Sequence, residues 1–353
     1  MAKSEKIRIG ARELESLVRA MFEKMGMRGE EADTVARVLV WANLRGVDSH
    51  GVSRIPRYVE LFESSEAKAR PDIAVSRPRP ATLLVDADGA PGPVAMCRAM
   101  QEAIATARKT GVAWAAVRGT VHTGAIGYYT SLAADAGMIG IGMVAGMPNM
   151  AYTGVKGAAV ATSPLSIGVP SRSRGNVVLD MATATIALGR IAQYRIAGKP
   201  LPDGAALTEA GEPTTDPKLA QIPTPMGGAK GAGMSLVFEL ITSVLAGNPI
   251  ITGFHAGTPE GQKHRQNGAL VAVDIEAFSS LADFRTLVDD TLATLKGLPQ
   301  AAGTEEILFP GERAERVYRQ RSSGGIPVPG TVWQKLVKDA EKLGVVIPEV
   351  TAA

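Results

Sequence analysis

The first sixty residues carry apolar side chains at helical spacing in two adjacent segments. The apolar positions are Leu14, Leu17, Val18, Met21, Phe22 and Met25 in the first segment, and Ala32, Val35, Ala36, Leu39 and Ala42 in the second. Steps of three and four residues place such side chains along one face of a helix. Because glycine readily adopts the left-handed conformation that ends helices, the pattern predicts one helix up to Gly26 and another from about Glu30. A third, short helix is expected over 58–62.

Farther along the chain, short apolar runs alternate with amphipathic stretches. Short apolar runs between turn residues are typical of buried strands, and longer periodic stretches are typical of helices. Strands are expected over 82–85, 112–117, 138–145, 164–170, 177–180 and 270–273, and helices over 93–109, 124–136, 183–193, 229–245, within 275–296, and over 332–343. This alternation of strands and helices in the middle of the chain predicts an α/β fold.

Three polar stretches lack this periodicity. Residues 66–80 are rich in Lys, Arg, Pro and Ser and are expected to form an extended linker. Residues 199–225 and 248–267 are expected to be loops. The first of these two is longer than a usual connection, so it is either functional or wrapped over the surface.

The composition excludes several classes of protein. The chain of 353 residues is 45% apolar and 21% charged, which is ordinary for a globular protein. Its net charge of +3 and its 5% aromatic content argue against nucleic-acid binding. No run of eighteen apolar residues is present, so no membrane span is expected, and the N-terminal MAKSEKIRIG lacks the apolar core of a signal peptide. The chain has a single cysteine, Cys97, which favours a reducing compartment, expected to be the cytoplasm. Cys97 itself is expected to be a small buried core residue and not a nucleophile.

The strongest candidate for chemistry is the segment Asn43–Tyr58, NLRGVDSHGVSRIPRY. His50 follows Ser49 and precedes Arg54 by four residues, so a helix that begins near His50 would place both side chains on one face. An imidazole beside a permanent cation suits a site that handles a small carboxylate.

Several familiar motifs are absent. The sequence has no phosphate-binding GxxxxGK[ST] loop, no HExxH and no GxSxG. The run from Gly140 to Gly146 has the wrong spacing for a dinucleotide fingerprint and lies inside an expected strand. The histidines His50, His122, His255 and His264 show no metal-ligand spacing with cysteine, so no metal site is predicted.

Three more segments carry candidate residues at the junctions of elements. They are 119–129 with His122, the pair 161–167 and 179–183 with Asp180, and the glycine cluster 227–233 around Lys230. Backbone N–H groups at the helix start after His122 could hold a phosphate, and a lysine at a helix start could meet an anion. Each feature alone is more often structural: a loop histidine bonds its neighbours, and a carboxylate caps a helix. Their occurrence together favours a site.

The separated motifs resemble the malate/L-lactate dehydrogenase family of NAD(P)-dependent oxidoreductases that lack a Rossmann fold. The resemblance covers nearly the whole chain. It rests on GVDSHGVSRIPRY (46–58), the His-x-Gly turn with GYY (122–129), PLSIGVP (164–170), LDMAT (179–183), PTTDP (213–217), GGAKGAG (227–233) and PGERAERVY (310–318).

The resemblance implies a mixed, mainly antiparallel sheet with flanking helices and a homodimer with its active site near the subunit interface. We expect an N-terminal helical region, 1–75, that carries the catalytic motif and packs with the C-terminal part, a cofactor-binding region, 76–225, and a sheet-completing region, 226–353. The implied roles are: catalytic, Ser49, His50 and His122; substrate-binding, Arg54 and Thr162; cofactor-binding, His122, Thr123, Gly124, Ala125, Ile126, Asp180, Met181, Ala182 and Lys230.

The implied activity is hydride transfer between NAD or NADP and C2 of a small 2-oxo or 2-hydroxy carboxylic acid. Reduction of a cyclic imine-2-carboxylate and a non-catalytic nucleotide-binding scaffold are the alternatives. Which histidine moves the proton stays open, as does the choice between NAD and NADP, for which Arg172 and Arg174 are candidate phosphate ligands. Gly119-Thr120-Val121 and Thr123 depart from the usual family pattern, as does Ala161-Thr162-Ser163-Pro164, which favours a specialised substrate.

Overall fold

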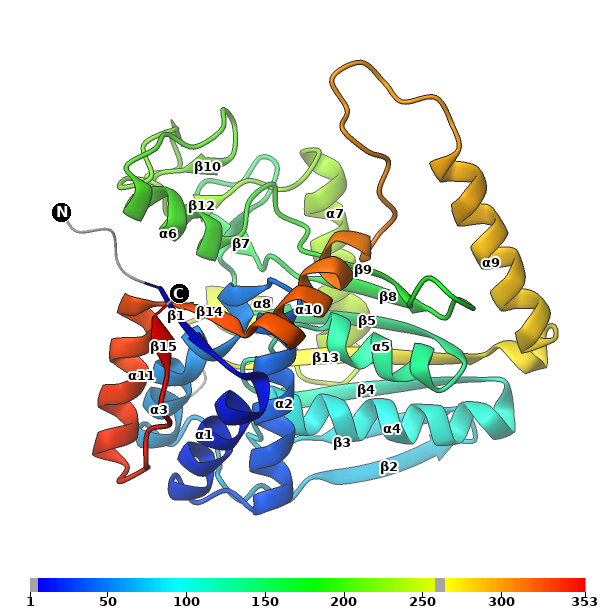
Figure 1. Cartoon of the computed structure of the whole chain (residues 1–353), viewed down its shortest axis with the longest axis horizontal. Helices are drawn as coiled ribbons and strands as arrows, with labels where there is room; N and C mark the ends of the chain where they lie inside the picture. The colour runs from blue at the N-terminus through cyan, green and yellow to red at the C-terminus, as the bar shows by residue number, and fades with distance from the viewer. Residues whose placement is uncertain (1–5, 258–263, 353) are drawn as a thin grey trace.

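The computed structural model describes residues 6–257 and 264–352, and a mixed sheet forms its centre (Figure 1). The strands in their order across the sheet are β2 (Ala74–Arg79), β3 (Thr82–Asp86), β4 (Val112–Thr120), β13 (Gln266–Asp274), β5 (Met138–Gly146), β8 (Leu165–Val169) and β9 (Val177–Met181). Strands β3 and β4 run parallel, and every other neighbouring pair in this sheet is antiparallel. The predicted fold class is confirmed.

Helices cover both faces of the sheet. Helices α4 (Gly92–Thr110) and α5 (Gly127–Asp135) pack on one face, and α7 (Ala229–Glu239) packs on the other with the π-helical turn Leu240–Val244. Side chains alternate along β13 accordingly: Leu270 packs with the α4 side and Ala269 with Phe238 of α7. Burial on both faces explains why these strands read as continuous apolar runs.

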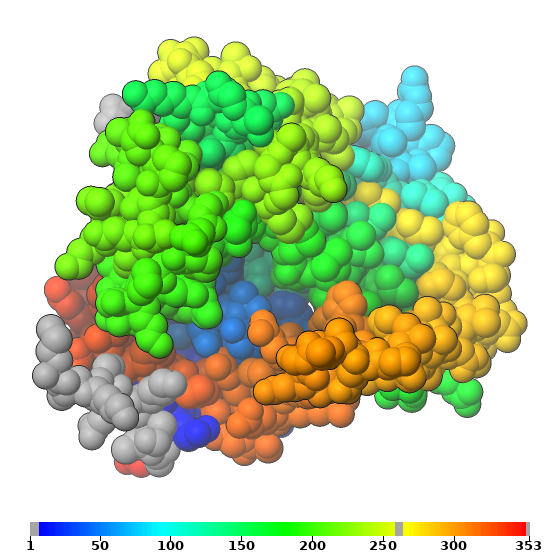
Figure 2. Space-filling model, turned by 90° about the horizontal axis from the view of Figure 1, so that it is seen from above, coloured from blue at the N-terminus to red at the C-terminus, as the bar shows by residue number. Residues whose placement is uncertain are grey.

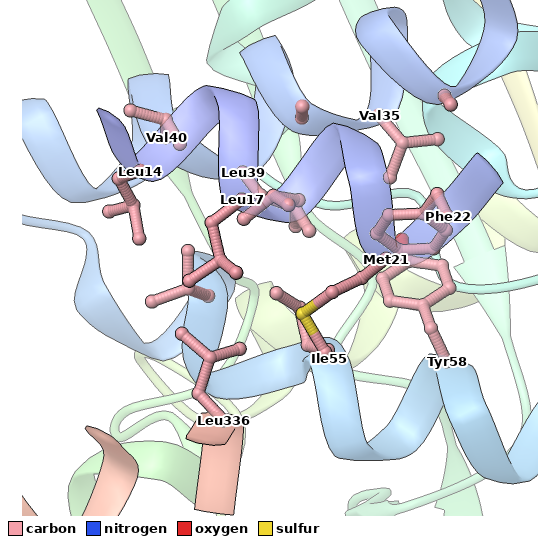
Figure 3. Packing of buried hydrophobic residues seen from close by; sticks show 14 of the residues in the cluster. Leu14, Leu17, Met21, Phe22, Val35, Leu39, Val40, Ile55, Tyr58 and Leu336 are labelled. Carbon is pink, nitrogen blue, oxygen red and sulfur yellow. The ribbon is translucent and has the colours of Figure 1, made fainter. Parts of the chain in front are cut away.

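A second core joins the two ends of the chain (Figure 3). It is built by α1 (Ala11–Lys24), α2 (Gly29–Leu44), α3 (Ile55–Glu63) and α11 (Gly330–Lys342). A small sheet lies beside it, in which β1 (Lys6–Ile9) pairs with β14 (Ile326–Pro329) and β15 (Thr351–Ala352). The first predicted helix is confirmed: five of its six apolar positions are buried in α1, and Gly26 follows with φ of 96°.

A lobe beside the main sheet differs from its prediction. It comprises α6 (Leu188–Ala197), β10 (Ala206–Leu207), β11 (Pro213–Thr214) and β12 (Ile222–Pro223). Most of 199–225 is irregular, as predicted, but the stretch also contains three two-residue strands, and Leu201, Ala205 and Ala220 bury a small core of their own with α6. The helix predicted from Thr183 begins only at Leu188, since the N–H groups of Thr183 and Thr185 donate to Thr162 and Thr224 instead.

The boundaries of two other polar stretches also differ from the prediction. The extended stretch 66–80 ends as the edge strand β2, and the polar stretch 248–267 contains α8 (Ile251–His255) and the start of β13, while 258–263 lie outside the described residues. The remaining elements are β6 (Met150–Ala151), β7 (Ala158–Val160), α9 (Leu281–Lys296) and α10 (Glu312–Gly324). Within the described parts of the chain, no helix combines the length and apolarity that a membrane crossing requires.

Candidate active site

A cavity of about 1010 Å³ lies where the N-terminal helices, the main sheet, the lobe and α10 meet. Figure 2 shows a hollow between the green lobe and the orange segment around residue 300, with blue atoms of the N-terminal segment at its floor. The residues with predicted roles that line the cavity are Ser49, His50, Arg54, His122, Thr123, Gly124, Ala125, Ile126, Thr162, Asp180, Met181 and Ala182. Lys230 does not line it: this side chain is exposed at the start of α7. A smaller cavity of about 480 Å³ under the lobe has no charged side chain in its wall.

The His50 segment is not the helix that the spacing predicted. It forms two 3₁₀ turns, Asp48–His50 and Val52–Arg54, separated by Gly51. The side chain of Asn43 explains the break: its Oδ1 accepts the Val52 N–H (2.9 Å) and occupies the place where a Cβ of residue 51 would lie, 2.1 Å away. Asp48 accepts hydrogen bonds from Asn43 Nδ2 (2.7 Å) and from Arg321 of α10 (2.7 and 3.1 Å).

Arg54 and His50 nevertheless face the same cavity. The Nε of Arg54 donates to the Ser49 carbonyl oxygen at 2.6 Å, and no carboxylate among the described residues pairs with this guanidinium. The Oγ of Ser49 lies 3.1 Å from His50 Nδ1. A partly buried cation without a fixed anion is ready to bind a carboxylate, bidentately where the geometry permits.

His122 follows β4 and lies beside His50. The two rings are stacked, with centroids 5.9 Å apart and planes 17° apart. The hydroxyl oxygen of Tyr58 lies 3.0 Å from His122 Nδ1 and 3.0 Å from the carbonyl oxygen of the same residue. The predicted pair of histidines therefore meets in one site, although 72 residues separate the two in sequence (122 minus 50).

The surroundings of both histidines disfavour the protonated imidazole. Burial lowers the pKa of His50 to about 4, and the nearby Arg54 guanidinium lowers it further in the same direction. Burial also holds the pKa of His122 well below 6.5, with smaller contributions from Arg54, His50 and Arg57. Neutral imidazoles can accept a proton from a substrate, which is the role of a general base.

The turn after His122 is fixed by side chains that the sequence analysis did not single out. Gln266 Oε1 accepts hydrogen bonds from both the N–H (2.8 Å) and the Oγ1 (2.9 Å) of Thr123. The expected helix start at Gly124 is wrong: α5 begins at Gly127, whose N–H donates to Asp180 Oδ2 at 2.9 Å. That carboxylate takes the place at this helix start where a phosphate was expected.

Asp180 is the acidic residue of the cavity wall. Its side chain is solvent-exposed and forms part of the cavity wall. Desolvation by the surrounding wall raises the pKa of Asp180 to about 6, against the opposing effects of the Gly127 N–H and of Arg45. A carboxyl group so placed can accept a hydrogen bond from a ligand amide or hydroxyl.

Positive charge dominates the cavity wall. Its arginines are Arg45, Arg54, Arg57, Arg190, Arg265, Arg313 and Arg321, against the single carboxylate of Asp180. Arg45 pairs with Glu315, and Arg321 pairs with Asp48, whereas the partner of Arg265 among the described residues is the neutral Asn248 Oδ1 at 3.2 Å. A nicotinamide dinucleotide carries a negative pyrophosphate, so this charge and a volume of about 1010 Å³ fit it together with a small acid. Arg172 and Arg174 do not line the cavity; the backbone of their loop bonds to Asp289.

Sequence reasoning missed Tyr58, Gln266 and Asn149 as site residues. Tyr58 closes the recognised motif, but only the fold brings its hydroxyl to His122. Gln266 lies in a stretch that was read as loop, and Asn149 Oδ1 accepts the Thr162 N–H at 2.9 Å. No local pattern marks either residue, because their partners lie 143 and 13 residues away.

The chain belongs to the malate/L-lactate dehydrogenase family, whose model matches residues 9–337. Among its relatives, the ureidoglycolate dehydrogenase (NAD(+)) of Escherichia coli O157:H7 is 31% identical over 341 residues, which are 95% of this chain and 96% of that protein. The malate dehydrogenase of Pyrococcus abyssi is 32% identical over 349 residues and covers 96% of both chains. The solved Δ1-piperideine-2-carboxylate reductase of Pseudomonas syringae superposes with a TM-score of 0.84 at 26% identity, over 94% of this chain and 99% of that one.

Proposed function

We propose that this protein transfers a hydride between a nicotinamide cofactor and C2 of a small 2-hydroxy or 2-oxo carboxylic acid. One observation carries the proposal: two stacked histidines face one cavity together with an arginine that has no carboxylate partner among the described residues. Family membership and the names of the relatives support the same chemistry, and those names include both NAD(+) and NADP(+).

The residues of this chain divide the work as follows. Arg54 binds the substrate carboxylate and so places C2 near the histidines. A neutral histidine takes the hydroxyl proton of the acid during oxidation and returns it during reduction. The turn after His122, together with Asp180, Met181 and Ala182, would hold the nicotinamide cofactor, which would supply the hydride chemistry when bound. Thr162, oriented by Asn149, lies in the same wall and can contact the substrate.

The charge of the wall favours a substrate with a second acidic group over a cyclic imine. Arg265 lines the same cavity as His50, Arg54 and His122 and adds a cation to its wall. A second carboxylate or a sulfonate would compensate this charge, whereas the apolar ring of a piperideine-2-carboxylate would leave it unpaired. Imine reduction stays the second candidate because of the solved reductase with the same fold.

A substrate panel tests the proposal. Purified protein is mixed with NAD(H) or NADP(H) and with malate-type, sulfolactate-type, lactate-type or ureidoglycolate-type acids or cyclic imines, and turnover is followed at the nicotinamide absorbance band. We expect turnover of a diacid with the highest kcat/KM. Faster turnover of the cyclic imine would select the second candidate. Binding of the cofactor without turnover of any compound would indicate a non-catalytic scaffold.

Arg54→Ala tests the carboxylate contact, with Arg57→Ala as the matched control on the same turn of the structure. Hydrogen bonds to charged groups contribute about 1.5–3 kcal/mol, so Arg54→Ala should raise KM roughly 10–150-fold. Arg57 pairs with Glu60 at 2.6 Å, so its removal should raise KM less. Equal KM values in both variants would remove Arg54 from its role.

We also propose that the protein is a homodimer. The exposed residues Val237, Leu240 and Val244 form an apolar stripe along α7 and its π-helical turn, and each is between 47% and 49% exposed. Helix α9 adds an exposed Leu287. Apolar helix faces of this kind mark protein interfaces. Light scattering should give the mass of a dimer for the native chain and of a monomer for Leu240→Glu; a native monomer would refute the assignment.

The division into regions at residues 75 and 225 and a cytoplasmic location stay predictions of this proposal. The buried single cysteine is compatible with a reducing compartment. Limited proteolysis would test the division into regions, with cleavage expected near residues 75 and 225. Cell fractionation would test the cytoplasmic location.

A further inference from the structure

Tyr58 is fully buried and touches His122 twice. Its side chain packs edge-on against Phe22 in the core between α1 and α3, with ring centroids 5.4 Å apart (Figure 3). Its hydroxyl oxygen lies 3.0 Å from both Nδ1 and the carbonyl oxygen of His122. Burial raises the pKa of this phenol far above its usual range, so the hydroxyl keeps its proton.

The two contacts have to share one hydroxyl hydrogen. A carbonyl oxygen can only accept, so the Tyr58 hydroxyl must donate to it for that contact to be a hydrogen bond. The phenol oxygen is then free to accept from Nδ1–H of His122. The opposite arrangement, with the hydroxyl donating to Nδ1, would leave two oxygen atoms facing each other at 3.0 Å without a hydrogen between them. The His122 carbonyl oxygen also accepts the Gly92 N–H at 3.2 Å, so it has a donor in either arrangement. Only the first arrangement, however, places a hydrogen in both contacts of the Tyr58 hydroxyl.

We propose that Tyr58 is a positioning residue that fixes the Nδ1–H tautomer of His122, so that the catalytic proton enters and leaves at Nε2. The bond to Tyr58 is the same in the neutral and the protonated ring, because Nδ1 carries a hydrogen in both. Nε2 has no partner among the described residues, and the ring lines the cavity. This inference rests on the proposed function: during oxidation the hydroxyl proton of the acid forms a bond to Nε2 while C2 gives up its hydride.

His50 has no equivalent support. Its Nδ1 meets only the hydroxyl of Ser49, at 3.1 Å, and that hydroxyl can either donate or accept. Ser49 therefore does not select a tautomer of His50. The fixed ring is suited to the proton transfer itself, and the adaptable ring is suited to pass a proton between the site and solvent.

Nitrogen NMR on the free protein tests the tautomer without any substrate. The chain has only four histidines, so ¹⁵N-histidine labelling gives few signals, and His122→Gln identifies those of residue 122. We expect a protonated Nδ1 and a bare Nε2 in the native protein, and a mixture of tautomers in Tyr58→Phe. A native protein with hydrogen on Nε2 would overturn the proposal.

Kinetics test the consequence. Tyr58→Phe should lower kcat by at least tenfold and leave KM nearly unchanged; a catalytic histidine held in the wrong tautomer can lose roughly 10⁴-fold. The matched control is Tyr129→Phe, which also loses one buried phenol bond, to the Thr123 carbonyl at 2.5 Å, but does not touch the His122 ring. In the His122→Gln background, Tyr58→Phe should have no further effect on kcat.

The outcomes separate this inference from the function on which it rests. Equal losses of kcat in the two tyrosine variants, with an unchanged His122 tautomer, would reduce Tyr58 to a packing role. If Tyr58→Phe does not fold, as judged by its thermal unfolding, the native spectrum still decides the tautomer. Absence of turnover with every acid would refute the proposed function and leave the tautomer assignment standing.

Discussion

The segments that carry the two histidines reach the same cavity from differently built supports. His50 lies on a short turn that is held by side chains of two other elements, Asn43 of the preceding helix α2 and Arg321 of the distant helix α10. His122 lies directly after a central strand, and its ring is held from the core by Tyr58. The comparison shows that two identical imidazoles differ through the hydrogen-bond partner of Nδ1, which is Tyr58 for His122 and Ser49 for His50.

The largest expected effect comes from removing each ring. Positioned general acid–base groups contribute about 10²–10⁴-fold to rate, so His122→Ala should lower kcat by a factor in this range. His50→Ala should also lower kcat strongly, but by a smaller factor, because the proton can leave His122 through water. Rapid-mixing measurement of hydride transfer gives both numbers. A greater loss in His50→Ala would reverse the assignment of the two rings.

A smaller effect is expected from removing Asn43, the side chain that holds the His50 turn. Asn43→Ala leaves the buried Val52 N–H without its acceptor and Asp48 with one donor fewer. Buried groups left unsatisfied cost about 1–3 kcal/mol each, so urea unfolding should show a loss of this size. Ser53→Ala, which removes one partly buried bond to the Asp48 carbonyl, is the control and should lose less. Unchanged stability in Asn43→Ala would mean that water replaces the amide.

The smallest expected effect is a shift in the pH dependence of kcat/KM, and it distinguishes the two histidines. A base must be neutral, and the pKa of both histidines lies below 6.5, so kcat/KM for oxidation should fall only when the pH drops below this value. Arg57 lowers the pKa of His122 but does not act on that of His50. In Arg57→Gln the pKa of His122 should therefore rise. The fall of kcat/KM at acid pH should then begin at a higher pH than in the native protein. A fall that begins at the native pH would assign the titrating group to His50.

The sequence predicted most of the scaffold because burial leaves regular patterns. The repeat from Leu14 to Phe22 is reproduced by α1, and the apolar runs of β4, β5 and β13 form neighbouring strands. The lobe was missed for a physical reason: with only Ile186, Ile191, Leu201 and a few alanines in its core, its two-residue strands leave no periodic signal.

The site was predictable only where its parts lie within one motif. Ser49, His50 and Arg54 are neighbours in sequence, and the resemblance brought in His122 and Asp180. The supporting contacts are set by the fold: Gln266 reaches Thr123 and Arg321 reaches Asp48 across more than a hundred residues. Local spacing carries no information about such pairs. Lys230 shows the converse, since a lysine among glycines suggested an anion site and lies outside the cavity wall.

The contact between Arg321 and Asp48 spans 273 residues, so the turn that carries His50 is held by a helix that is synthesised long after it. A ribosome-bound chain that already contains both histidines still lacks the cation that pairs with Asp48. The His50 turn therefore gains this support only after α10 has been made.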